Sequence, residues 1–347
     1  MKKTFYLLSL MFVIISCSDA GDNPQTPGDG DGYDRSAMMQ SLADELIIPG
    51  YEDLNTKLQN LKTTKDAYLS GSATLDQLKS DWHTAYQSWQ SVAVYNIGPS
   101  DDLLYTYQMN IYPTNLGDIS ANIASGSYDL ASANNNDAVG FPAVEYLLYR
   151  YDNLSAPEAQ TYLSDLIDRM AELTSQVLEG WNTGYRETFI SSTDNTATSA
   201  VNMFVNDYIY YVEKSFRANK IGIPAGVFST EPLADRVESL YAEVYSKELC
   251  LLALDNIEAV FQGQPTGLED YLDFLGNASL AQEILAQIQE ARNAIDPLDD
   301  NFYQQVETDN TALLRAYDEI QKLVVLLKVD MLQELNISVD YVDADGD

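Results

Sequence analysis

Histidine is almost absent from this chain of 347 residues, in which His83 is the only one. Catalytic zinc sites and hydrolase triads are built with imidazole side chains, so any such site has at most one to draw on here. Cations are also scarce, because 19 Lys and Arg stand against 53 Asp and Glu, for a formal net charge of -34. A surface of this charge repels a polyanion, which excludes nucleic acid as a partner.

Cysteine is equally rare, and one of the two cysteines lies in the N-terminal segment. Lys2 and Lys3 precede an apolar run over residues 5–15, which is too short to span a bilayer as a mature helix. This pattern predicts a signal peptide over residues 1–16. The Ile-Ile-Ser-Cys sequence that ends at Cys17 resembles a bacterial lipobox, so we expect Cys17 to be the first mature residue and to carry a lipid anchor.

The residues after Cys17 lack apolar periodicity. Residues 17–35 are rich in Gly, Asp and Pro, which predicts a flexible tether. Ser18 stands where enteric-type sorting uses Asp for retention in the inner membrane, so we expect the outer membrane as the destination. With Cys17 acylated, Cys250 has no partner for a disulfide, and its apolar surroundings predict a small buried side chain.

Alternation of apolar and polar residues with a period of two is also almost absent, which argues against a β fold. Apolar residues instead recur every three or four positions, which is typical of helices that bury one face. Four such stripes cover residues 75–92, 163–177, 240–257 and 313–331. We therefore predict an all-α fold of two helical bundle domains packed side by side, residues 36–190 and residues 191–347, the second ending in a short extended tail.

Several short segments occur in a characteristic order along the chain. They are Ile-Pro-Gly-Tyr at 48–51, Trp-His-Thr-Ala-Tyr-Gln-Ser-Trp at 82–89 followed by Ile-Gly-Pro at 97–99, Gly-Phe-Pro-Ala-Val-Glu-Tyr-Leu-Leu at 140–148, Lys-Ile-Gly-Ile-Pro-Ala-Gly at 220–226, and Asp-Ala-Asp-Gly-Asp at 343–347. Together they resemble the imelysin-like family of bacterial envelope proteins, from about Ala37 to the C-terminus. The resemblance implies two helical bundle domains with a cleft between them, in lipoproteins or periplasmic proteins linked to iron uptake. Some members of the family are known as metallopeptidases.

The family's signature, Gly-x-His-x-x-Glu, falls on Gly140, Pro142 and Glu145. His and Glu three residues apart on a helix share one face and can bind one cation. Here the histidine position is Pro142, whose side chain has no donor or acceptor, and a lone carboxylate falls short of the three ligands of a catalytic zinc. Glu145 is the candidate metal ligand. The alternative is an acid in the first turn of a helix in which Pro142 is an early residue, held by the helix dipole or by hydrogen bonds.

Three other features have simpler structural explanations. His83 lies next to Trp82, whose face is buried, so we expect His83 to be exposed rather than to supply a ligand. Trp82 and Trp89 are seven residues apart and share one face, which predicts core packing. The three aspartates of residues 343–347 begin like a calcium loop, but the chain stops before the loop is complete, so they predict a solvated acidic tail.

The sequence therefore favours a non-catalytic binding protein of the cell envelope, anchored through the lipid on Cys17. We expect it to be a monomer that is accessory to the uptake of iron or of another divalent or trivalent cation, with an envelope transporter as a partner. A metallopeptidase of the imelysin type is one alternative. A carbohydrate-binding envelope lipoprotein is another, suggested by the 24 tyrosines.

Overall fold

The computed structural model describes residues 31–341, which form helices and loops without a β-strand. The predicted all-α fold is therefore confirmed. The predicted signal peptide, Cys17 and the acidic residues 343–347 lie outside the described residues. Within the described part of the chain, no helix combines the length and the apolar composition needed to cross a membrane.

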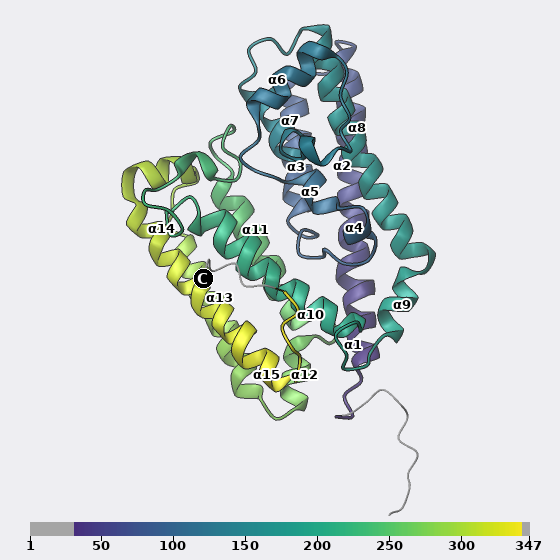
Figure 1. The fold of residues 1–347 in the computed structure, drawn as a ribbon, viewed down its shortest axis with the longest axis vertical. Helices are drawn as coiled ribbons and strands as arrows, with labels where there is room; N and C mark the ends of the chain where they lie inside the picture. Colours follow the sequence, from purple (N-terminus) through teal and green to yellow (C-terminus); the bar gives the residue numbers. More distant parts are fainter. Residues whose placement is uncertain (1–30, 342–347) are drawn as a thin grey trace, which may run out of the picture.

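The first group of helices is organised around three long ones, of which the first packs against both of the others (Figure 1). These are α2 (Ile48–Leu69), α3 (Leu75–Trp89) and α8 (Pro157–Gly180). Shorter elements complete the group: α4 (Pro99–Asp102), α5 (Tyr105–Met109), α6 (Leu116–Ser125), η2 (Ala133–Ala138) and α7 (Gly140–Tyr149). Trp82 and Trp89 are buried on α3, as their spacing predicts.

The first long helix begins well before the Ile-Pro-Gly-Tyr segment at 48–51. The chain is helical from α1 (Arg35–Ser41) through the π-helical η1 (Leu42–Ile47) and into α2. Pro49 lies near the start of α2, where its ring has no N–H and collides with the carbonyl one turn earlier in an α-helix. The wider turn of η1, in which the Ile48 N–H donates to the Ala43 carbonyl, accommodates this proline without breaking the helix.

The second group contains the remaining helices, in which α13 packs against α11 and α14, and η4 packs against the same two helices. Its elements are α10 (Ala200–Tyr210), the π-helical η4 (Tyr211–Gly222), η5 (Ala234–Arg236), α11 (Ser246–Gln262), α12 (Leu268–Phe274), α13 (Ala278–Ile295), α14 (Phe302–Val325), η6 (Leu326–Met331) and α15 (Leu332–Glu334). The connection from α8 runs through η3 (Trp181–Tyr185) and α9 (Arg186–Ser191). The segment after α15 packs on this group, where Asn206 Nδ2 donates to the Ser338 carbonyl over 3.1 Å.

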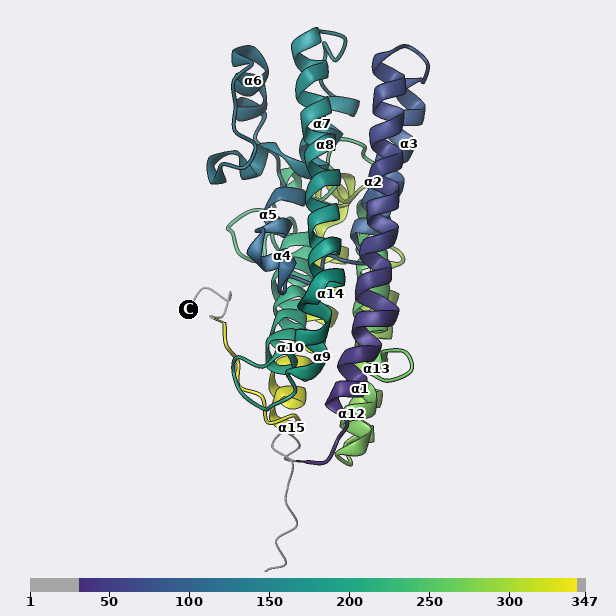
Figure 2. The same ribbon diagram turned by 90° about the vertical axis from the view of Figure 1, so that its right-hand side faces the viewer.

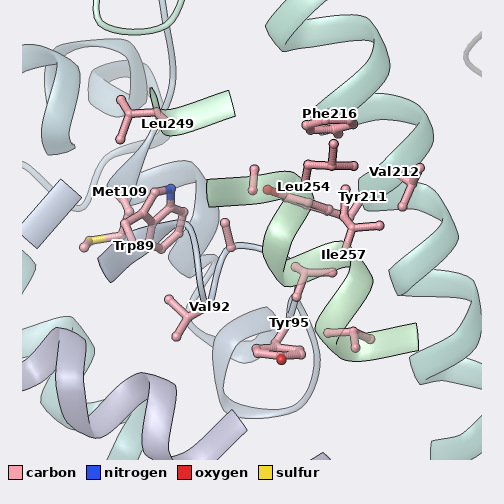
Figure 3. Close-up of a cluster of buried hydrophobic side chains, with 14 of the residues drawn as sticks. Trp89, Val92, Tyr95, Met109, Tyr211, Val212, Phe216, Leu249, Leu254 and Ile257 are labelled. Atoms are coloured by element: carbon pink, nitrogen blue, oxygen red, sulfur yellow. The ribbon is translucent and has the colours of Figure 1, made fainter. Parts of the chain in front are cut away.

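The two groups lie side by side and share a hydrophobic core (Figures 1 and 2). In the close-up of Figure 3, Trp89 and Val92 from the first group face Tyr211 and Leu254 from the second. All four side chains belong to one continuous cluster of buried residues. Because this apolar contact joins the groups, the division into two domains at residue 190 stays a prediction.

The fold begins earlier than the predicted end of the tether. Tyr33 stacks on Tyr271 of α12 with ring centroids 4.3 Å apart, and Arg35 Nε donates to the Tyr271 hydroxyl over 2.8 Å. Asp31 accepts from Arg35 Nη2 over 2.6 Å and from the same hydroxyl over 2.6 Å. The last residues of the expected tether, 31–35, therefore belong to the folded part of the chain.

Candidate functional site

The glycine of the signature motif is required by a close approach of two chain segments. Gly140 begins α7 with φ +75°, a conformation that residues with a side chain rarely adopt. A Cβ placed on Gly140 would lie 2.2 Å from the carbonyl oxygen of Met109, at the end of α5. Gly140 therefore lets α7 pack directly against the backbone of α5, and Pro142 is buried in the turn that follows.

Glu145 is almost fully buried, with 1% of its surface exposed, and it reaches from α7 to the segment between η5 and α11. Its Oε1 accepts three hydrogen bonds: from Ser239 Oγ over 2.8 Å, from the Ala242 N–H over 2.9 Å and from the Tyr241 N–H over 3.2 Å. Burial raises the pKa of Glu145 to about 7, against the opposing effect of these three donors.

The expectation that Glu145 lies in the first turn of its helix is wrong. Pro142 is an early residue of α7, as expected, but the helix already begins at Gly140, so Glu145 lies in the second turn, where the helix dipole has little effect. The other part of that alternative, an acid held by hydrogen bonds, describes the observed contacts. The hydrogen-bond donors to Glu145 come from the other side of the interface between the two groups of helices.

A second buried acid, Glu238, lies next in sequence to one of these donors and forms the centre of a polar network. Its Oε1 accepts from Asn110 Nδ2 over 2.8 Å and from the Tyr86 hydroxyl over 3.1 Å, and its Oε2 pairs with the Lys220 ammonium. Lys220 Nζ also donates to Gln90 Oε1 over 3.0 Å. The network joins α3 and the chain after α5 to η4, so polar contacts as well as apolar ones hold the two groups together.

The segment that carries Glu238 has an unusual backbone. Ser239 and Glu243 have φ values of +57° and +65°, in the left-handed region that side chains disfavour. Such conformations persist when surrounding contacts fix them. Glu145 supplies three of those contacts, and Ser246 Oγ adds a fourth by donating to the Glu238 carbonyl over 2.7 Å. Glu145 thus positions the segment that presents Glu238.

His83 is not exposed as expected. Its ring stacks on Tyr245 with centroids 3.7 Å apart, its Nε2 lies 2.7 Å from Glu248 Oε2, and 19% of the side chain is accessible. The expectation is wrong because α3 lies against the first turn of α11, which covers the face next to the Trp82 stripe. The partner of His83 is Glu248 rather than Glu145.

Metal-ligating side chains do not converge in the part of the chain that the structure describes. Within residues 31–341, no three His, Cys, Asp or Glu side chains lie close enough to hold one ion. Cys250 is buried, and desolvation raises the pKa of its thiol to about 12, so it stays a neutral thiol. The metal role of Glu145 stays a prediction.

A cavity lies between the two groups, where the family resemblance implies a cleft, but the residues that line it were not predicted from the sequence. Its outer chamber has a volume of about 340 Å³ and its inner chamber about 70 Å³, and the inner one reaches Lys220. Both are lined by Tyr211, Ser215 and Asn219 of η4 and by Asn110 from the first group. Asn110 lies far from the η4 residues in the chain, so no local pattern indicates that they converge. The one local signal is the four-residue spacing of Tyr211, Ser215 and Asn219 on η4.

The fold and the site define a class of protein. It is a helical protein in which two groups of helices meet at a buried helix, here α7, that carries a Gly-x-x-x-x-Glu motif. The imelysin family model matches residues 47–329, and the chain belongs to this family. No functionally curated protein matches the sequence.

Two solved structures share the fold. The first, an imelysin-like protein from Psychrobacter arcticum 273-4, is 17% identical over 91% of this chain and 100% of that one, with a TM-score of 0.74. The second is described as a putative iron-regulated protein A precursor from Parabacteroides distasonis ATCC 8503. It is 19% identical over 87% of this chain and 95% of that one, with a TM-score of 0.73.

Proposed function

We propose that this imelysin-family chain is a lipid-anchored, non-catalytic protein of the cell envelope that is accessory to the uptake of iron or of another metal. The lipobox-like sequence before Cys17 supports the anchor and an outer-membrane location. The family supports the envelope role, and a protein of the same fold is described as iron-regulated. In this proposal the chain acts as a monomer beside an envelope transporter.

The environment of Glu145 is the observation that carries the non-catalytic part of the proposal. A catalytic zinc needs about three protein ligands and a position for water. Here Pro142 offers no ligand atom, and Oε1 of Glu145 already accepts three hydrogen bonds from the 239–242 segment. These contacts support a positioning role for Glu145 over a catalytic one.

Direct metal binding at Glu145 is the alternative that the same residue allows. Its second oxygen, Oε2, accepts no hydrogen bond from the described residues, which leaves it for a cation. Calorimetric titration of the full chain with ferrous iron, ferric iron and zinc separates the roles. Binding that the parent shows and Glu145→Ala loses, with folding intact by circular dichroism, assigns the metal to Glu145. Equal binding by both rules this residue out as a ligand.

The anchor and the uptake role are tested together in a strain that lacks the gene. The parent chain should restore uptake of radiolabelled iron under iron limitation, whereas Cys17→Ser should leave the membrane fraction and restore little. Cys250→Ser is the matched control, because it makes the same substitution at a buried cysteine without a lipid. Unchanged iron uptake in the deletion strain would refute the uptake role.

The metallopeptidase alternative has a direct assay. The full chain should leave casein intact with or without added zinc. Hydrolysis by the parent that a chelator stops, and that Glu145→Ala abolishes, would establish the peptidase and overturn the non-catalytic proposal.

A further inference from the structure

The inner chamber of the cavity contains two buried donors without a partner among the described residues. They are Trp89 Nε1 and the Tyr211 hydroxyl, which belong to two residues that line the chamber and are 2% and 5% exposed. In Figure 3 the Tyr211 hydroxyl points from η4 toward Trp89. An indole N–H can only donate, and burial beside Glu238 raises the pKa of Tyr211, which keeps its hydroxyl protonated. The chamber is therefore prepared for an oxygen acceptor.

Lys220 adds donor capacity at the same place without adding net charge. Its ammonium has three N–H groups, of which two are engaged by Gln90 and by Glu238. Because Glu238 neutralises the ammonium, the chamber gives no net attraction for an anion. The net charge of -34 on the whole chain disfavours anions further. A neutral ligand rich in oxygen fits this electrostatic environment.

The outer chamber has the chemistry of hydroxyl recognition. Asn219 and Ser215 line it, and their side chains make no hydrogen bond with the described residues. Asp207 and Lys214, which have opposite formal charges, line it as well. Amides and hydroxyls both donate and accept, as neutral hydroxyl groups require. Tyr107 and Tyr210, which are 49% and 37% exposed, lie at the opening and offer flat apolar faces. The volume of about 340 Å³ is at the lower end of the range for small-molecule sites.

We propose that this cavity binds a neutral saccharide of one or two rings, with a hydroxyl oxygen in the inner chamber that accepts hydrogen bonds from Trp89 and Tyr211. Tyr211, Ser215 and Asn219 recur every four residues along η4 and form one wall, and π-helical turns such as those of η4 are frequent at functional sites. The site uses no metal and is independent of the proposed uptake role.

Calorimetry on the full chain tests the proposal, in a polyoxyethylene detergent that contains no sugar and with a chelator present. The probes are glucose, N-acetylglucosamine and maltose, each at millimolar concentrations. We expect saturable binding of at least one of them. Tyr211→Phe should weaken it about three- to tenfold, the effect of one lost neutral hydrogen bond. Ser215→Phe should abolish it, because Ser215 lines both chambers and the substitution places a phenyl ring where they adjoin.

Tyr95→Phe is the matched control. The Tyr95 hydroxyl is also buried without a partner among the described residues, but it lines neither chamber. Both Tyr→Phe variants should unfold at the temperature of the parent or above it, because each removes an unpaired buried hydroxyl. Only Tyr211→Phe should lose affinity. The proposal is overturned if none of the three sugars binds, if Tyr211→Phe binds like the parent, or if the chain binds ferric citrate but no sugar.

Discussion

Glu145→Gln gives the sharpest test of how the buried carboxyl at the interface contributes to stability. Burial raises the pKa of Glu145 from its ordinary value of 4.5 to about 7 in the folded chain. Between these two pH values the folded chain keeps the proton and the unfolded chain releases it. The contribution of Glu145 is therefore fully present below pH 4.5 and is lost as the pH rises through 7, a fall of about 3 kcal/mol.

The glutamine variant should lack this fall, because its amide does not titrate and its oxygen can still accept from Ser239, Tyr241 and Ala242. Urea unfolding followed by circular dichroism, in chelator and at a series of pH values from 4.5 to 8, gives both stabilities. The variant should gain about 3 kcal/mol on the parent across this range. Glu52→Gln, at an exposed site on α2, corrects for the change in net charge. A difference between variant and parent that stays constant with pH would refute the reasoning.

Three further outcomes are expected. Gly140→Ala should lower the free energy of unfolding by about 2 kcal/mol more than Gly126→Ala. Both glycines have positive φ, but only at Gly140 would the added Cβ collide with backbone. Equal losses of stability in urea unfolding would contradict this. Lys220→Met should lower the free energy of unfolding by about 4 kcal/mol, because it leaves Glu238 buried without its cation. Adding Glu238→Gln should recover part of this loss, whereas additive losses would argue against the pair. Cys250, whose thiol has its pKa raised to about 12 by burial, should react with N-ethylmaleimide only in urea, and labelling of the native chain, mapped by mass spectrometry, would contradict its burial.

The helices could be predicted because their information is local. The three- and four-residue spacing of apolar side chains on α3 predicted the burial of Trp82 and Trp89 without any tertiary knowledge. The start of the first helix could not be found in the same way. Pro49 reads locally as a helix start, and only the tertiary packing of α1 and η1 maintains a helix on its N-terminal side.

The site shows the same limit more strongly. The motif located Glu145, but its three donors lie about a hundred residues away in the chain, in a segment with no pattern of its own. His83 was predicted to be exposed because it lies outside the apolar stripe of α3. The sequence pattern of α3 alone does not show that α11 packs against this part of the helix and covers it. The lining residues of the cavity come from both groups of helices, so tertiary packing rather than a local pattern brings them together.

The contacts of residues 31–35 with α12 determine where a tether would join the folded part of the chain. The chain enters the fold at the end formed by α1, α12 and α15, and α6 lies at the opposite end of the long axis (Figures 1 and 2). With a lipid on Cys17, the α12 end would be the end of the fold that the tether joins, and α6 would lie far from it. Because Tyr33 and Arg35 contact the second group while α1 continues into the first, tension on the anchor would reach both groups at once. Such tension would not separate the two groups.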